Sequence, residues 1–295
     1  QVIYRPHSPP FGLPTPPPAM VCPCCVPGVA ILLLVMAFVG LKLFGLFALC
    51  LPSKKLQLFL SWAATGVAVL VGALGVFLGV AANNKALRKW VFAHFIAAMQ
   101  TANVEMRPWR CGIVGDVAGD LLEIGPGPAS NFVCWENNTK ITSWVGIEPN
   151  TNFEEHINET KSKYHMGFPT SLKWYQGEHL DVPEASVDHV VITLVLCSVD
   201  DVDKVLREAK RALKVGGSIV FMEHVADWTP GLRRQLQDTV FGSFFYTFGD
   251  GCNFRETWHH IDKLKGDFDV NYTFAQAPEI WPISPQINGR ATRLS

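Results

Sequence analysis

Two long apolar segments dominate the first third of the chain. Residues 28–51 contain one charged side chain, Lys42, and residues 56–82 contain none. About 20 apolar residues in a helix cross the hydrocarbon core of a bilayer. A soluble domain has little room for two consecutive helices that are apolar on every face. Because only a short turn (52–55) separates the segments, the pattern predicts a helical membrane hairpin over 28–82.

The segments that flank this hairpin carry different patterns. Residues 1–27 are rich in proline, which cannot sustain a helix, so they predict an extended leader. Residues 83–103 place apolar side chains at helical spacing after basic ones, which predicts an amphipathic linker helix along the membrane surface. Basic residues lie at both ends of 56–82, and positive charge favours the cytosolic side. We therefore expect a hairpin that enters and leaves on the cytosolic face, either across the bilayer or within one leaflet.

Residues 104–295 alternate short apolar runs with helical patterns. The expected strands are 120–124, 143–148, 172–176, 187–193 and 218–223, and helical patterns cover 150–166 and 200–214. Such alternation predicts a mainly parallel sheet with helices on both faces. Two late runs, 268–275 and 286–293, add an antiparallel pair. We expect one α/β domain over 104–295, built on a doubly wound, mostly parallel sheet of seven strands.

Composition and charge narrow the possible functions. Of the 295 residues, 48% are apolar and 17% are charged, against about 25% charged in an ordinary soluble domain. The net charge is −1, but all 26 acidic residues lie at or after Glu105, with only basic charges before it. The high apolar content and the low charged content exclude a disordered chain. The acidic back half also argues against nucleic-acid binding, because phosphate backbones require clustered Lys and Arg.

The cysteines are spread along the chain without a framework pattern. Three lie just before the first apolar segment, where they are either unmodified or palmitoylated: Cys22, Cys24 and Cys25. Four further cysteines in the back half are expected to be unpaired singletons in a reducing compartment: Cys111, Cys134, Cys197 and Cys252. No ligand spacing predicts a metal site. Three Asn-X-Thr sequons, at Asn137, Asn158 and Asn271, are relevant only in the secretory lumen.

A glycine-containing loop follows the first expected strand. Gly125 and Gly127 alternate with prolines there, and bare backbone at a strand end can approach a ligand closely. Glu148 ends the second expected strand, a position from which a carboxylate accepts hydrogen bonds from ribose hydroxyls in doubly wound sheets. The alternative is a plain tight turn. No Gly-Lys-Ser/Thr follows, which disfavours phosphoryl transfer.

These motifs carry a family resemblance. The segments 121–127, 147–150, 177–180 and 211–217 resemble the motifs of class I S-adenosylmethionine-dependent methyltransferases. The chain is most similar to the membrane-anchored, methyltransferase-like thiol S-methyltransferases, through 193–199, 223–226, 249–252 and 255–258. The resemblance implies a Rossmann-like fold and S-adenosylmethionine as the cofactor. It implies that the cofactor contacts Glu123, Gly125, Gly127, Glu148, Pro149, Gly177, Glu178, His179 and Leu194.

The acceptor side follows from the chemistry that the resemblance implies. A methyl group on a sulfonium is already activated, so transfer needs alignment more than acid catalysis. A thiol attacks as its thiolate. His224 is the candidate general base, and a structural histidine is the alternative. Packing is the expected role of Cys197 and Cys252. The aromatic residues after the fifth strand form either a substrate lid or core: Trp228, Phe244, Phe245, Tyr246 and Trp258.

The sequence therefore predicts a membrane-associated methyltransferase for a small apolar thiol. Its expected partners are that thiol and the lipid bilayer, with no nucleic acid and no metal. The expected location is the endoplasmic reticulum or the lipid droplet, with the catalytic domain facing the cytosol. Two alternatives stay open. The acceptor is an oxygen or carbon of a lipid or quinone, or the domain is a non-catalytic binding module, which the two prolines beside Gly127 would favour.

Overall fold

The computed structural model describes residues 53–102, 105–278 and 281–295. Helix α2 (Lys54–Asn83) belongs to one compact unit, and Lys89–Ser295 belong to another. The predicted leader 1–27 and the first apolar segment 28–51 lie outside the described residues. The helix expected over 56–82 lies within α2, whose Leu58–Asn83 stretch is long and apolar enough to cross a membrane. The hairpin itself stays a prediction.

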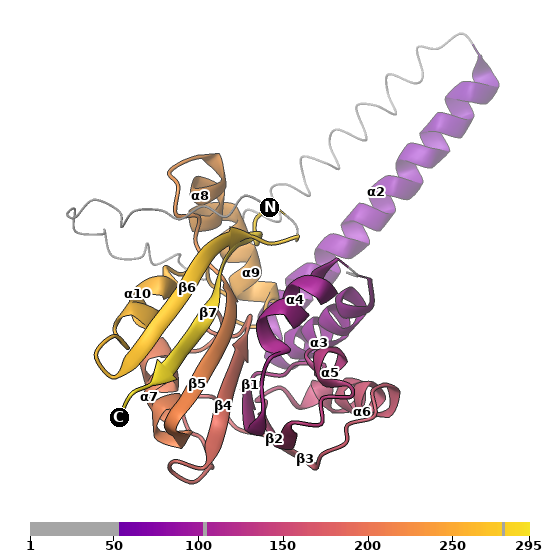
Figure 1. The fold of residues 1–295 in the computed structure, drawn as a ribbon. Helices are drawn as coiled ribbons and strands as arrows, with labels where there is room; N and C mark the ends of the chain where they lie inside the picture. The colour runs from indigo at the N-terminus through magenta and orange to yellow at the C-terminus, as the bar shows by residue number, and fades with distance from the viewer. Residues whose placement is uncertain (1–52, 103–104, 279–280) are drawn as a thin grey trace. The chain divides into compact units, whose positions relative to one another are not determined.

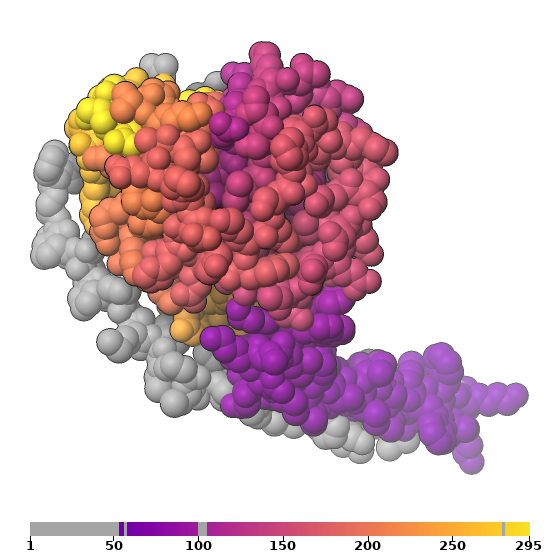
Figure 2. Space-filling model, turned by 90° about the horizontal axis from the view of Figure 1, so that it is seen from below, coloured from indigo at the N-terminus to yellow at the C-terminus, as the bar shows by residue number. Residues whose placement is uncertain are grey.

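The second unit is built on a seven-stranded sheet in the order β3-β2-β1-β4-β5-β7-β6 (Figure 1). Five neighbouring strands run parallel, whereas β7 pairs antiparallel with both β5 and β6. This confirms the predicted mostly parallel, doubly wound sheet. Figure 2 shows the yellow and orange C-terminal segments on one side of this domain and the magenta and pink segments on the other. The strands are β1 (Gly119–Ile124), β2 (Ile141–Ile147), β3 (Thr170–Lys173), β4 (Val187–Thr193), β5 (Leu213–His224), β6 (Phe268–Gln276) and β7 (Pro285–Arg293).

Two hydrophobic cores lie on the two faces of this sheet. Side chains alternate along a strand, so Leu121 of β1 joins one core and Leu122 joins the other. The Leu121 core includes residues of α3 (Lys85–Ala102), α4 (Met106–Val114), α5 (Phe132–Trp135) and α6 (Glu154–Lys163). The Leu122 core includes residues of α7 (Val202–Ala212) and α10 (Thr257–Asp262). Short helical segments complete the chain: η1 (Thr151–Phe153), α8 (Leu232–Leu236), the π-helical η2 (Gln237–Phe241) and α9 (Gly242–Phe248).

Helix α7 shows how the sequence directs this packing. Its buried side chains recur at helical spacing, so one stripe faces the sheet. The Asp201 side chain accepts a hydrogen bond from the Lys204 backbone N–H at 2.9 Å and caps the first turn. The helix ends at Ala212. The predicted turn 214–217 lies where the β4–β5 pairing shifts register, between the pairs Val187–Leu213 and His189–Ser218.

Helix α3 is more than a connection between units. From Lys89 onward it packs on the domain, where Ala93 is fully buried and the Phe92 ring meets the edge of Phe153 at a centroid distance of 6.0 Å. Trp90 and Phe95 are exposed. The helix expected as a linker along a membrane surface therefore buries one side in the hydrophobic core of the domain and leaves other apolar side chains exposed to solvent.

Cys111 of α4 and Cys134 of α5 form a disulfide, with their Cα atoms 5.0 Å apart. The expectation that both are unpaired singletons is wrong. Helices α4 and α5 contribute to the same core, which brings together two cysteines that are 23 residues apart in the chain. Cys197 and Cys252 are free and buried.

Candidate active site

The loop after β1 has the backbone conformation that its glycines allow. Gly125 and Gly127 have φ angles of +64° and +54°, in the left-handed region that side chains disfavour. The Gly125 backbone N–H donates to the Ile147 carbonyl at 2.8 Å, which joins this loop to the end of β2. A Cβ atom at Gly125 would collide with the Val195 side chain beyond β4. Glycine is therefore required where three strand ends meet.

Glu148 lies beside this loop, at the carboxyl end of β2. Its carboxylate accepts hydrogen bonds from the backbone N–H groups of Gly127 at 3.0 Å and Asn150 at 2.9 Å. Burial raises the pKa of Glu148 to about 7, against the lowering effect of those two bonds. The structure thus brings together the carboxylate and the glycine loop that the sequence singled out. Pro149 is exposed next to them.

Glu123 faces the interior of the protein. Its carboxylate accepts from the Asn131 side-chain amide at 2.7 Å and from the Trp144 indole N–H at 2.8 Å, and the residue is fully buried. Burial raises its pKa to about 7. These bonds link the end of β1 to β2 and to the start of α5, just before the glycine loop. Its predicted contact with a cofactor stays a prediction.

The loop 177–179 follows β3 and is anchored by its own side chains. Glu178 is buried and accepts from the backbone N–H of Asp200 at 2.8 Å, near the start of α7. The exposed His179 lies 2.8 Å from the Lys204 ammonium. A Cβ atom at Gly177 would press on Ile124 of β1. Both polar side chains thus bind α7 or the turn before it, and the predicted contact of this loop with a cofactor stays a prediction.

The loop after β4 is held from β5. Leu194 has a φ of +58°, unusual for a leucine, and its backbone N–H donates to the Met222 carbonyl at 2.8 Å. The fully buried Glu223 carboxylate accepts from the backbone N–H groups of Val195 at 2.9 Å and Leu196 at 3.2 Å. Outliers of this kind persist where the surroundings impose them, often at functional sites.

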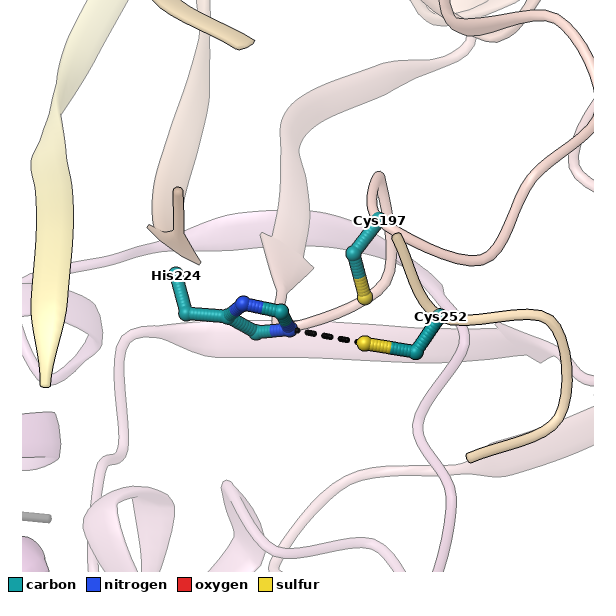
Figure 3. A group of neighbouring side chains, drawn as sticks. All are labelled: Cys197, His224 and Cys252. Carbon is teal, nitrogen blue, oxygen red and sulfur yellow. Dashed lines mark hydrogen bonds between the residues drawn. The ribbon is translucent and has the colours of Figure 1, made fainter. Parts of the chain in front are cut away.

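Three buried side chains converge beyond the carboxyl ends of β4 and β5 (Figure 3). They are Cys197 from the loop after β4, His224 at the end of β5, and Cys252 from the loop between α9 and α10. The His224 Nε2 atom lies 3.2 Å from the Cys252 Sγ atom, and the three ligand-type atoms lie within 4.8 Å of one another. We call these three residues the Cys-His-Cys cluster.

The cluster is electrostatically unusual. The hydrogen bond from Cys252 and, after it, the His224 imidazole hold the pKa of the Cys197 thiol well below its usual range. Burial and the neighbouring Cys197 raise the pKa of Glu223 to about 8. The sequence analysis missed this grouping because 28 residues separate His224 from Cys252, with no ligand spacing between them. One signal was present: the family-like segments 193–199, 223–226 and 249–252 each supply one of the three side chains.

The loop 249–253 links the cluster to the glycine-loop side of the site. The Asn253 backbone N–H donates to the Cys197 carbonyl at 2.9 Å. Asp250, whose φ is +52°, lies near enough to Glu148 that its charge raises the pKa of that carboxyl. Parallel strands present their carboxyl ends at one edge of a sheet, where such folds bind ligands. Glycine loop, carboxylate and cluster therefore share one edge.

The five aromatic residues proposed for a lid do not act alike. Trp258 is buried, and both it and Trp228 pack on Phe274 with ring centroids 5.3 and 4.9 Å away. Phe244 and Tyr246 of α9 are about half exposed. Phe245 of the same helix packs against Phe254, which also contacts the His224 ring. The core role thus holds for the two tryptophans.

Comparison with known proteins gives the family and the fold. Residues 122–221 match the family model described as a methyltransferase domain. The chain is 35% identical over 176 residues to the rat thiol S-methyltransferase TMT1B, covering 59% of this chain and 70% of that protein. It is 35% identical over 177 residues to the human thiol S-methyltransferase TMT1A, with the same two coverages.

One solved structure supports the fold at low sequence identity. A chain in the complex containing the Haloferax volcanii Trm112 methyltransferase activator matches with a TM-score of 0.52 and 12% identity. The match covers 69% of this chain and 96% of that one. At this identity the match indicates the fold alone.

Proposed function

Because the chain belongs to the thiol S-methyltransferase family and is an S-adenosylmethionine-dependent methyltransferase, we propose that it methylates a small apolar thiol at a membrane surface. The observation that carries the proposal is the shared sheet edge, where the Glu148–Gly127 hydrogen bond lies at the ends of β1 and β2 and the Cys-His-Cys cluster lies beyond the ends of β4 and β5. The family relationship favours sulfur as the acceptor.

The residues at this edge fit the cofactor. Glu148 presents a carboxylate suited to ribose hydroxyls, and Gly125 and Gly127 leave the main chain bare beside it. Leu194, with its turn, supplies apolar surface for the methionine part, and the backbone of 177–179 is the candidate adenine edge. When bound, S-adenosylmethionine supplies a methyl group on a sulfonium, whose C–S bond breaks and leaves its electron pair on the departing thioether.

The chain must hold the acceptor as a thiolate, because the thiolate is the nucleophilic form of a thiol. The new S–C bond uses an electron pair of the acceptor sulfur, and the thiol proton leaves to solvent. We assign the stabilisation of this thiolate to the Cys-His-Cys cluster, whose thiol and imidazole groups lie at the same sheet edge. His224 takes part as a member of the cluster and not as an isolated base, since its Nε2 atom already engages Cys252.

Helix α2 supports membrane attachment. Only 11% of its most apolar window is buried, and large apolar side chains are exposed along it, including Trp62, Leu70 and Val76. Such exposure in water is costly, whereas a bilayer satisfies it. Flotation of the full chain with liposomes tests this role. We expect wild-type protein to float and the Leu70→Arg, Val76→Arg variant to remain in solution; equal flotation would exclude a tether through α2.

We propose that the catalytic domain faces the cytosol on the endoplasmic reticulum or the lipid droplet. Lys85, Arg88 and Lys89 follow α2 directly, and positive charge beside a membrane helix favours the cytosolic side. The Cys111–Cys134 disulfide is the feature that favours the lumen instead. The sequon residues Asn137, Asn158 and Asn271 are all exposed, so expression in microsomes decides: glycan on any of them would refute the cytosolic orientation.

A matched acceptor panel tests the reaction. Purified protein receives methyl-labelled S-adenosylmethionine and pairs of alkyl or aryl thiols and their hydroxyl analogues, with lipids and quinols alongside. We expect label on thiols, more on apolar than on charged ones, and none on the matching alcohols. Label on phenols, lipids or quinols without thiols would overturn the thiol assignment. Folded protein that fails to bind S-adenosylhomocysteine in calorimetry would instead indicate a non-catalytic module.

A further inference from the structure

We propose that the Cys-His-Cys cluster is a binding site for a thiophilic divalent cation, with Zn²⁺ as the best match. Two cysteine sulfurs and one imidazole nitrogen form a ligand set that selects zinc over calcium or magnesium, which prefer oxygen. Cys197, His224 and Cys252 come from three separate segments, yet their ligand atoms lie within 4.8 Å of one another. The proposal has two parts: the cluster binds the ion, and the bound ion holds the acceptor thiolate. The second part, its catalytic half, deepens the proposed function and rests on it.

The dimensions suit a tetrahedral ion. Zinc binds sulfur at about 2.3 Å and imidazole nitrogen at about 2.0 Å, so its ligand atoms lie roughly 3.5–3.8 Å apart. The His224 Nε2 and Cys252 Sγ atoms are 3.2 Å apart, and the whole set fits within 4.8 Å. Small side-chain movements would bring the three ligand atoms to the separations that one tetrahedral ion requires.

Burial of the cluster favours an ion as well. Cys197, His224 and Cys252 are all buried, and the Phe254 ring covers the imidazole with centroids 5.6 Å apart. Once both cysteines have ionised to bind a metal, two thiolates in such surroundings need a counter-charge, because an isolated buried charge is costly. One divalent cation neutralises both. On binding it, each cysteine forms an S–metal bond and releases its proton to solvent, so charge and atoms balance.

The number of ligands indicates an open position. Structural zinc sites have four protein ligands, whereas catalytic sites have three and leave the fourth for water or substrate. Among the described residues the cluster supplies three. It lies beside Leu194 and Val195 at the edge assigned to the methyl donor, with the Cys197 Sγ atom 3.8 Å from the Leu194 carbonyl oxygen. The acceptor thiol would occupy the fourth position as a thiolate, after releasing its proton to solvent.

Metal content gives the direct test. Full-length protein is purified under reducing conditions, stripped with a chelator, reloaded with Zn²⁺ and analysed by elemental mass spectrometry. We expect about one zinc per chain in the wild type and a loss of at least tenfold in zinc affinity in Cys197→Ser and Cys252→Ser. The matched control is Cys111→Ser, Cys134→Ser, which removes two sulfurs away from the cluster and should keep the zinc. S-adenosylhomocysteine binding reports that each variant is folded.

Cobalt gives an independent readout. Co²⁺ in the wild-type site should show the visible absorption of thiolate-bound cobalt, which Cys197→Ser should weaken and the control variant should keep. Failure of folded wild-type protein to retain Zn²⁺ or Co²⁺ would overturn the site. If the protein binds zinc but methylates thiols equally well after a chelator has removed the metal, the catalytic half of the proposal would be overturned. The acceptor panel fails or succeeds separately, because it measures methyl transfer and not metal.

Discussion

The Glu148 carboxylate accepts a hydrogen bond from the Gly127 backbone N–H at 3.0 Å, although 21 residues separate the two. This contact joins the carboxyl ends of β1 and β2 and brings the carboxylate to the glycine loop. A second bond, from the Asn150 N–H at 2.9 Å, holds the other carboxylate oxygen. The side chain is thus oriented before any ligand arrives, which reduces the cost of ordering it on binding.

Replacing Glu148 should weaken cofactor binding. A hydrogen bond to a charged group contributes about 1.5–3 kcal/mol, so we expect Glu148→Ala to raise the Kd for S-adenosylhomocysteine about 10- to 100-fold in calorimetry. Glu154→Ala, on the exposed surface of α6, is the matched control and should bind normally. An unchanged Kd in folded Glu148→Ala would refute the ribose role.

Cofactor affinity should rise with pH through neutrality. The pKa of Glu148 is raised to about 7 by burial and by nearby Asp250, while Lys89 and two backbone N–H groups lower it. If the carboxylate form binds ribose, the Kd should fall about tenfold between about pH 6 and about pH 8. Glu148→Gln should remove this dependence, and a slope that persists in the variant would assign it to another group.

The same group has the opposite effect on stability. Its pKa is higher in the folded protein than in the unfolded chain, so the folded state holds the proton more tightly between the ordinary glutamate value of 4.5 and about 7. Its contribution to the free energy of unfolding therefore falls as pH rises through that window and is constant above it. Denaturant unfolding of wild type and Glu148→Gln at several pH values measures the difference.

Gly125→Ala should destabilise the domain. An alanine there keeps an unfavourable positive φ and its Cβ meets the Val195 side chain. Strain of about 1–2 kcal/mol and overpacking of about 1–3 kcal/mol predict a loss of roughly 2–5 kcal/mol in the free energy of unfolding. Gly167→Ala is the control, because its Cβ would meet nothing within 4 Å. Equal losses in the two variants would contradict the close approach of the loops.

The Cys111–Cys134 disulfide should stabilise the oxidised protein. Its partners are 23 residues apart, and closing a loop of that length contributes about 3 kcal/mol in the chain-entropy account. Cys111→Ala should lose about this much in urea unfolding without reductant. In dithiothreitol the two proteins should differ far less. A difference of the same size in reductant would point to packing at Cys111 rather than to the covalent bond.

Much of the fold was readable from local patterns. The short apolar run that contains Leu121 and Leu122 and the helical stripe of α7 extend over a few residues and therefore predict their elements directly. The glycine loop and Glu148 could likewise be recognised, because a βα turn and the end of the next strand have defined places in a doubly wound sheet.

The sequence by itself thus determined the seven strands in chain order, the helices α3, α6 and α7, the apolar character of α2, and the glycine loop and carboxylate that we propose for the cofactor. Only the tertiary structure decided that Cys111 pairs with Cys134, that α3 packs on the domain, and that His224 meets two cysteines. The physical reason is range: periodicity and turn chemistry act between near neighbours. Contacts across 23 or 28 residues depend on how whole elements pack, and no short pattern encodes them.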